Sequence, residues 1–334
     1  MARGKLTLRV LAGLTAFALA GLTACGTGGG APGVSGGGGE KKAIGVSVAD
    51  QKSLFYVAAV QGMQAQAEKR GYKLVVTSAN NNSSQQVSQV NDLLTQQVGA
   101  LIFTSQDSTA AAAGVKAANK AQVPVIAVDQ RPESGQGELA TYIATDSVKA
   151  ARELCTWMFQ QMGGSGEIAI LHGVLGSTAE IQRTQGCQEA IKATPGIKVV
   201  AEETANWDET EAFKATQNIL AAHPQLKAVF GESDAMGLGA AKAAQQANRH
   251  DGMQFVGIDG FPTMFDGVKA GLTQATMAQQ PYHMGEIAVD NAIQIMEGGA
   301  ALPAEQYQDT VLINKDTVDQ NDVTKFYGPN AKSS

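Results

Sequence analysis

The stretch KLVVTSANNNSSQQVSQVNDLLTQQVGALIFTS, residues 73–105, decides the fold class. It begins with KLVVTS and ends with GALIFTS, two short apolar runs, and an amphipathic stretch near residues 85–98 separates them. A strand, a helix and a second strand in this order form a βαβ unit, in which the two strands are parallel. The stretch therefore predicts a parallel sheet with helices packed on both faces.

The same alternation continues on both sides of this stretch. A first series is completed by the strands AIGVSV and VPVIAVD and by helices near 55–70 and 108–121. A second series contains the strands TYIATD, GEIAILHG, IKVVAEET, LKAVFGES and MQFVGIDG, with helices near 147–162, 178–193, 209–222 and 235–247. TQATMAQQ and AEQYQDTVLI are further strands near the end. The sequence thus predicts an α/β protein with two doubly wound, Rossmann-like lobes.

Length and composition agree with two domains and exclude one class of partner. The chain has 334 residues, of which 44% are hydrophobic and 5% aromatic, and it carries a net charge of -6. This length is sufficient for two domains with separate cores. Because no basic cluster accompanies the negative charge, a nucleic-acid partner is not expected.

The first residues have the pattern of an export signal. Arg3, Lys5 and Arg9 precede a short apolar stretch that is followed by Leu-Thr-Ala-Cys, which resembles a bacterial lipobox. We expect residues 1–24 to be a signal peptide and Cys25 to be acylated, for example by palmitate, which would anchor the protein to the outer face of the cell membrane. The alternative is an ordinary secretory signal in which Cys25 is accidental. Residues 25–42 are rich in glycine and are expected to form a flexible tether.

Two cysteines remain beyond the leader. Cys155 and Cys187 both fall on predicted helices of the second series. Either a disulfide between neighbouring helices or two buried free thiols would suit an exported protein.

Polar residues collect where the predicted strands end, and ligands bind beyond these ends in open parallel sheets. Asp50 follows the first strand, and the sequence Asp-Gln-Arg at 129–131 follows the fourth. In the second series, Asp259 ends a strand, and Asp234 is expected to cap the helix that starts at Ala235. His172 and His283 also lie near predicted strand ends.

Motifs of catalysis are absent from the sequence. The chain has no GxxxxGK[ST] phosphate loop, no GxSxG elbow between a predicted strand and a helix, and no HExxH or CxxC metal motif among its four histidines and three cysteines. We therefore expect neither enzymatic activity nor a metal site or cofactor.

Three longer segments carry a resemblance to a known family. AEKRGYKLVVTSANNNSSQQVSQVNDLLTQQVGALIFTSQDS, NILAAHPQLKAVFGESDAMGLGAAKA and VGIDGFP, the last followed by GLTQATMAQQP, resemble the periplasmic sugar-binding proteins of the ribose-binding, LacI-like type. The resemblance implies the type I periplasmic binding protein fold. It implies one lobe from residues 43–144 and 281–309 and another from 145–280 and 310–334, joined by a three-segment hinge near Ala144, Gln280 and Asp309.

The resemblance also implies a set of ligand contacts. Phe55 and Tyr56 match aromatic residues that stack on a sugar, and Asp129, Arg183, Trp207, Asp259 and Gln279 match further contacts. Ser53 and Ser233 stand where asparagine is usual, and Gln130 stands where ribose binders have arginine. The complete set of expected ligand-binding residues is Ser53, Phe55, Tyr56, Asp129, Gln130, Arg183, Trp207, Ser233, Asp259 and Gln279.

These residue types suit a sugar on chemical grounds. Aromatic rings cover the apolar C–H faces of a sugar, while carboxylates accept its hydroxyl protons and a guanidinium donates in a fixed fork. Because the three replacements shorten or remove donors, we expect a monosaccharide or polyol other than ribose.

The resemblance implies a function in transport. The protein would be a monomeric, extracytoplasmic solute-binding lipoprotein that captures its ligand between two lobes and delivers it to an ABC permease with separate ATPase subunits. A receptor subunit that presents a sugar or a furanosyl signal to a membrane sensor is one alternative, and a surface enzyme acting on carbohydrates is a weaker one. A LacI-type transcription factor is excluded, because a leader stands in place of a helix-turn-helix.

Overall fold

The computed structural model describes residues 43–105, 108–132 and 135–331. The expected signal peptide, Cys25 and the glycine-rich tether lie outside these residues. All described residues belong to one unit, Glu40–Ser334, which contains two six-stranded sheets. Within the described part of the chain, no helix combines the length and hydropathy that a bilayer span requires.

The first sheet has the strand order β11-β5-β4-β3-β1-β2, and all its strand pairs are parallel. Its strands are β1 (Ile44–Val48), β2 (Leu74–Ser78), β3 (Ala100–Phe103), β4 (Val125–Val128), β5 (Thr141–Thr145) and β11 (Glu305–Gln308). The central strands β1, β3 and β4 are buried along their whole length, because helices cover both faces of the sheet.

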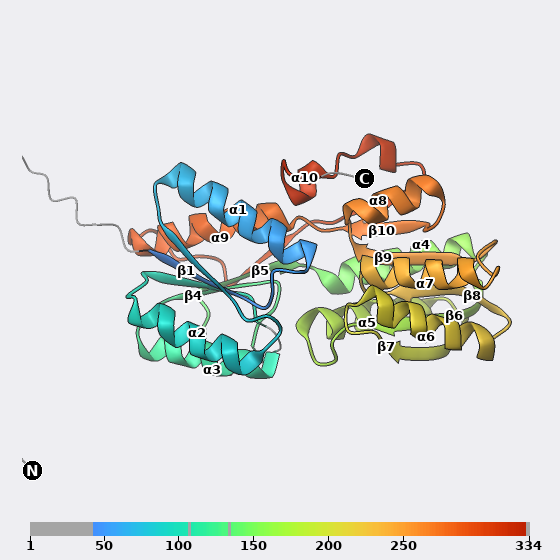
Figure 1. Ribbon diagram of the computed structural model, residues 1–334, viewed down its shortest axis with the longest axis horizontal. Helices are drawn as coiled ribbons and strands as arrows, with labels where there is room; N and C mark the ends of the chain where they lie inside the picture. The colour runs from blue at the N-terminus through green and yellow to red at the C-terminus, as the bar shows by residue number, and fades with distance from the viewer. Residues whose placement is uncertain (1–42, 106–107, 133–134, 332–334) are drawn as a thin grey trace, which may run out of the picture. The chain divides into compact units, whose positions relative to one another are not determined.

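Four helices form the layers on the first sheet. Helices α1 (Leu54–Arg70) and α9 (Pro281–Met296) lie on one side, and α2 (Ser83–Thr95) and α3 (Ser108–Lys120) lie on the other (Figure 1). Met63 of α1 and Ile293 of α9 belong to one fully buried cluster with the strands, whereas Leu93 of α2 and Val115 of α3 belong to another. The first sheet therefore has a separate core on each face.

The second sheet has the order β12-β10-β9-β8-β6-β7 and is parallel except for the β10–β12 pair, which is antiparallel. Its strands are β6 (Ser165–His172), β7 (Gly196–Thr204), β8 (Leu226–Gly231), β9 (Gln254–Asp259), β10 (Ala275–Ala278) and β12 (Val311–Asn314). The helices that follow these strands or precede them are α4 (Ser147–Gln161), α5 (Thr178–Ala193), α6 (Glu209–Ala222), α7 (Asp234–Gln246) and α8 (Pro262–Ala270). The chain then ends in a 3₁₀ turn (Val318–Gln320) and a short helix, α10 (Thr324–Tyr327).

Two expectations about the strands need correction. Thr141–Asp146 was expected to open the second series, but β5 pairs with β4 and β11 and is therefore a strand of the first sheet. The stretch Ala304–Ile313 was expected as a strand that recrosses between the domains, with a hinge segment near Asp309, and it forms two strands, β11 in the first sheet and β12 in the second. In both places the chain passes from one sheet to the other within a few residues, near Ala144 and Asp309. The apolar pattern alone does not indicate which sheet a strand joins, whereas the family resemblance implied a crossing near each of these residues.

Helices α1 and α9 approach each other unusually closely at two glycines. A Cβ atom added at Gly62 would lie 2.0 Å from the Tyr282 carbonyl oxygen, and one at Gly285 would lie 2.1 Å from the Ala59 carbonyl oxygen. Only glycine fits at these positions, because the obstructing atoms are backbone. The two glycines therefore let α9, which comes late in the sequence, pack directly on α1.

A disulfide joins two helices on the second sheet. Cys155 of α4 and Cys187 of α5 are bonded, with their Cα atoms 5.4 Å apart, and both side chains are fully buried. The bond lies within the apolar cluster that these helices form against β6, β8 and β9.

Candidate functional site

A cavity of about 540 Å³ lies beyond the carboxyl ends of strands from both sheets. Asp129 directly follows β4 of the first sheet, and Asp259 is the last residue of β9 in the second. The volume falls within the range of about 300–1,000 Å³ that is typical of small-molecule sites. Its position is the one expected for a ligand site in parallel α/β sheets.

The structure brings all the sequence-predicted ligand residues to the wall of this one cavity. They are Ser53, Phe55, Tyr56, Asp129, Gln130, Arg183, Trp207, Ser233, Asp259 and Gln279. These ten residues are spread over more than 220 positions of sequence, so their convergence depends on both sheets.

Other residues on the cavity wall were not singled out as ligand contacts. The polar ones are Asp50, Lys52, Asn81, Asn206, Asp208, Glu209 and Thr263, and the apolar ones include Leu54, Val174, Leu238 and Phe261. Asp50 had a signal in the sequence, since it follows the first strand. Its Oδ1 atom accepts hydrogen bonds from the backbone N–H groups of Lys52 and Ser53 at 2.6 and 2.8 Å, so it shapes the turn that leads into α1.

Arg183 is the buried cation of the site. Its side chain is 4% exposed, and its Nη1 atom donates to the Glu232 carbonyl oxygen at 2.5 Å and lies 3.6 Å from Asp259 Oδ1. The guanidinium carbon lies 5.5 Å from the centroid of the Trp207 ring. Among the described residues, Arg183 Nε is buried without a hydrogen-bond partner.

Asp129 is the carboxylate contributed by the first sheet. The Tyr56 hydroxyl donates to its Oδ2 atom at 3.2 Å, and the Tyr142 hydroxyl donates to its backbone oxygen at 2.6 Å. Burial raises the pKa of Asp129, while Arg183 and the Tyr56 hydrogen bond act in the opposite direction. Burial also raises the pKa of Tyr56 well above its ordinary value, so the phenol stays a donor.

Asp259 is the carboxylate contributed by the second sheet. Gln279 Nε2 donates to its Oδ1 atom at 2.8 Å, and the Tyr327 hydroxyl donates to its backbone oxygen at 2.9 Å. Burial raises the pKa of Asp259, and the nearby Arg183 opposes that effect. The Asp259 carboxylate lies next to the buried Arg183 guanidinium, and its oxygens can still accept hydrogen bonds from a ligand.

Asp234 is not the helix cap that the sequence suggested. Helix α7 begins at Asp234 itself, and Ser233 is its N-cap, with its hydroxyl accepting from the Met236 N–H at 3.4 Å. Asp234 is fully buried and accepts from the Gly260 and Phe261 N–H groups at 2.7 and 2.8 Å. Burial, and then the charge of Asp259, raise the pKa of Asp234. Asp234 thus fixes the turn after Asp259, which explains its position better than a cap does.

Two glutamines of the cavity wall connect the two sheets. The Gln130 Oε1 atom accepts from the Thr178 N–H at 2.8 Å, which links the end of β4 to the start of α5. The Thr145 hydroxyl, at the end of β5, donates to Gln279 Oε1 at 2.7 Å, while the other end of Gln279 binds Asp259. Both side chains are nearly fully buried. Gln130 thus connects the end of a first-sheet strand to α5, and Gln279 connects strand ends of both sheets.

Several residues of the wall have backbone conformations that cost free energy. Asp129 and Trp207 both have φ 64°, and Asp259 has φ 155°. Such conformations cost about 1–3 kcal/mol each for residues with a Cβ atom and collect at functional sites. Among the described residues, these three are the expected ligand contacts with positive φ; other non-glycine residues with positive φ, such as Gln97, Gln122 and Asn248, are not expected contacts.

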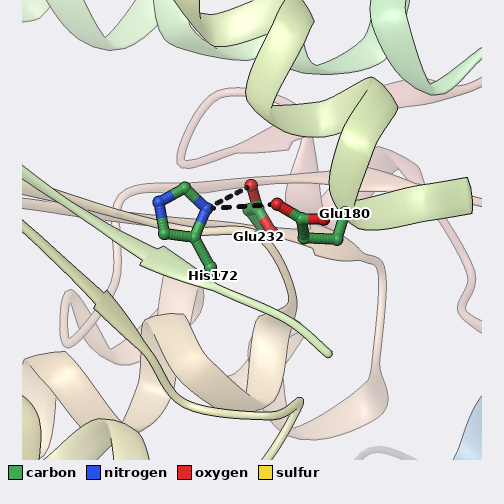
Figure 2. Close-up of side chains that lie close together, drawn as sticks. All are labelled: His172, Glu180 and Glu232. Carbon is green, nitrogen blue, oxygen red and sulfur yellow. Dashed lines mark hydrogen bonds and ion pairs between the residues drawn. The ribbon is translucent and has the colours of Figure 1, made fainter. Parts of the chain in front are cut away.

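His172 and His283 do not line the cavity. His283 lies on α9, half exposed, with its Nδ1 atom 3.1 Å from Glu286 Oε2. His172 instead belongs to a buried cluster with Glu180 and Glu232 (Figure 2). Arg131, also near a strand end, forms an ion pair with Glu305, and its guanidinium carbon lies 4.7 Å from the centroid of the Tyr142 ring.

Comparisons with known proteins agree with this arrangement. A family model described as a periplasmic binding protein domain matches residues 44–300. The ribose import binding protein of Bacillus subtilis is 34% identical over 262 residues, which cover 78% of this chain and 84% of the relative. A xylitol-binding protein of Mycolicibacterium smegmatis is 36% identical over 233 residues, which cover 70% of this chain and 66% of the relative.

A solved structure has the same fold. It is an ABC transporter periplasmic solute binding protein from Actinobacillus succinogenes with bound D-allose, and it superposes with a TM-score of 0.79 at 28% identity. The match covers 84% of this chain and 100% of the solved one.

Proposed function

Because the chain belongs to the periplasmic binding protein family, we propose that it captures a sugar or polyol between two lobes and delivers it to an ABC importer. The observation that carries this proposal is the cavity wall, which combines aromatic side chains with two carboxylates and a buried guanidinium. Aromatic faces suit the C–H surfaces of a sugar, and the charged groups suit its hydroxyls.

The proposed binding role assigns a task to each kind of residue. Phe55, Tyr56 and Trp207 form the faces of the slot, and Asp129 and Asp259 accept hydroxyl protons. Arg183 donates hydrogen bonds from its guanidinium. No step of bond making or breaking follows from this set, so the protein acts by binding rather than by catalysis.

The two lobes are proposed to be residues 43–144 with 281–309 and residues 145–280 with 310–334. A ligand that contacts both lobes favours the closed state through its higher affinity for that state. The closed form would be the signal to a permease, and separate ATPase subunits would supply the energy. The protein is proposed to be a monomer, held outside the cell membrane by a lipid on Cys25.

The proposed ligand is a neutral polyhydroxylated compound other than D-ribose. Gln130 supports this, because its carbonyl oxygen is engaged by the Thr178 N–H and it lacks the charge of the arginine that ribose binders have at this position. The relative named as a xylitol-binding protein is an example of a chain of similar sequence that binds a linear polyol.

A thermal-shift screen of the purified chain against monosaccharides, pentitols, hexitols and inositols tests the function and the ligand class separately. We expect one or a few compounds to raise the melting temperature by several degrees at micromolar to millimolar concentration. Absence of any shift across the panel would argue against sugar binding. A largest shift with D-ribose would leave the function intact and contradict the proposed ligand class.

A further inference from the structure

A cluster of metal-type donors lies outside the cavity wall. His172 ends β6, Glu180 lies in the first turn of α5, and Glu232 follows β8, and Figure 2 shows the three side chains turned toward one another. All three are at least nine-tenths buried. One donor atom from each lies within 4.8 Å of the other two. We propose that this cluster is a binding site for Zn²⁺ or a similar divalent transition-metal ion.

The separations between the donor atoms fit a tetrahedral shell. His172 Nδ1 lies 3.2 Å from Glu232 Oε1 and 3.7 Å from Glu180 Oε1. Zinc bonds of about 2.0–2.1 Å to nitrogen and oxygen place the ligand atoms of a tetrahedron roughly 3.4 Å apart. A cation between these three atoms therefore requires only small movements of the side chains.

Thr184 supplies a fourth oxygen at the same place. Its hydroxyl lies 3.1 Å from His172 Nδ1, 3.4 Å from Glu180 Oε1 and 2.5 Å from Glu232 Oε1. The 2.5 Å separation from Glu232 Oε1 is a hydrogen bond and is shorter than the edge of the tetrahedron. The hydroxyl would therefore have to move outward to become a neutral ligand, or give way to a water molecule. The site thus offers one nitrogen and two or three oxygens, a donor set that suits zinc better than calcium or magnesium.

Each proposed ligand is oriented by a hydrogen bond from its other end. Glu232 Oε2 accepts from the Gly173 N–H at 2.9 Å, and Glu180 Oε2 accepts from the Gly176 N–H at 3.0 Å. On the far side of the imidazole, His172 Nε2 lies 3.1 Å from Glu202 Oε2. A histidine held between a metal and a carboxylate, with ligating carboxylates that are themselves hydrogen-bonded, is the usual outer shell of a protein zinc site.

The charge of the cluster also favours a divalent ion. Glu180, Glu202 and Glu232 surround a single histidine, and no lysine or arginine of the described residues forms an ion pair with any of them. An imidazolium contributes one positive charge to this group, whereas a zinc ion bound to neutral imidazole contributes two.

The role of such an ion would be structural. It would join the ends of β6 and β8 to the first turn of α5, the helix that carries Arg183. The Glu232 backbone oxygen also accepts a hydrogen bond from Arg183. A bound ion would therefore help to position the Arg183 guanidinium both through α5 and through Glu232. This inference does not depend on the identity of the sugar.

Zinc binding by the purified chain, prepared without a histidine tag and stripped with a chelator, tests the proposal. After equilibrium dialysis we expect one Zn²⁺ per chain, and a rise in melting temperature of about 5 °C or more at a hundredfold excess over Kd. Glu180→Gln, which keeps an acceptor for the Gly176 N–H, should weaken zinc binding at least tenfold. His283→Gln is the matched control, because it removes a histidine that pairs with an exposed glutamate, and it should leave the stoichiometry at one.

Three results would overturn the proposal: no zinc retained by the wild type, equal zinc binding by wild type and Glu180→Gln, or loss of the ion in His283→Gln. Cobalt provides a second measurement on the wild type that requires no variant to fold. Bound Co²⁺ should give the intense visible absorption of a tetrahedral site, and the weak absorption of an octahedral ion would contradict the geometry. Neither experiment contains sugar, so failure of the sugar-binding proposal would show independently.

Discussion

At the residue scale, the expected ligand residues came from positions that match a family, and each carries a chemical group that suits a sugar. Asp129, Arg183 and Trp207 were named from their types and from the matching positions of a family, and the structure places all three on one wall. The structural roles of some expected ligand residues, in contrast, were not visible in the sequence. Gln130 was expected as a ligand contact, and the structure shows that its carbonyl oxygen also joins β4 to α5.

Asp129→Asn should weaken ligand binding by roughly 10- to 100-fold, because a hydrogen bond to a charged group contributes about 1.5–3 kcal/mol. The amide keeps the shape of the side chain but loses one acceptor and the negative charge. Isothermal titration calorimetry with the best ligand from the screen measures the change. Asp251→Asn, at a fully exposed position, is the control. Equal affinities for wild type and Asp129→Asn would remove the carboxylate from the binding site.

At the element scale, the order of helices and strands followed from alternation of apolar and amphipathic stretches, but their partners did not. Helix α9 comes after the whole second series and still packs on α1 of the first sheet. Gly62 and Gly285 make this contact possible, since any side chain there would meet backbone atoms. Nothing local marks these two glycines in the sequence.

Gly285→Val should lower the free energy of unfolding by about 1–3 kcal/mol or more, because the new side chain forces α1 and α9 apart. Chemical denaturation of the variant measures the loss. Gln64→Val places the same residue on an exposed position of α1 and should change stability by no more than about 0.5 kcal/mol. Similar stability of the two variants would contradict the proposed close contact.

At the scale of the whole molecule, buried hydrogen bonds connect the two sheets around the cavity. Gln130 reaches Thr178 of α5, and Thr145 of β5 reaches Gln279, which in turn binds Asp259. A ligand placed between Asp129 and Asp259 would add further contacts across the same gap. Ligand binding and approach of the lobes are therefore expected to be coupled.

Gln130→Ala should reduce ligand affinity by about 3- to 10-fold, the effect of losing one hydrogen bond of about 0.5–1.5 kcal/mol that favours the closed form. Small-angle scattering should show a decrease in radius of gyration when ligand saturates either the wild type or the variant. Gln246→Ala removes an exposed glutamine that pairs with Gln217 and serves as the control. Unchanged affinity in Gln130→Ala would show that the contact does not contribute to closure.

The sequence by itself determined the fold class and the polar character of the strand ends, because these depend on local periodicity and on chemistry that each residue carries alone. The expected ligand contacts came from the resemblance to a family. Only the tertiary structure decided that Asp234 supports a turn instead of capping α7, and that Cys155 and Cys187 are bonded. The cluster of His172, Glu180 and Glu232 was equally invisible, since its members come from β6, α5 and the end of β8. Contacts of this kind arise when segments far apart in sequence are packed together, and no spacing rule anticipates them.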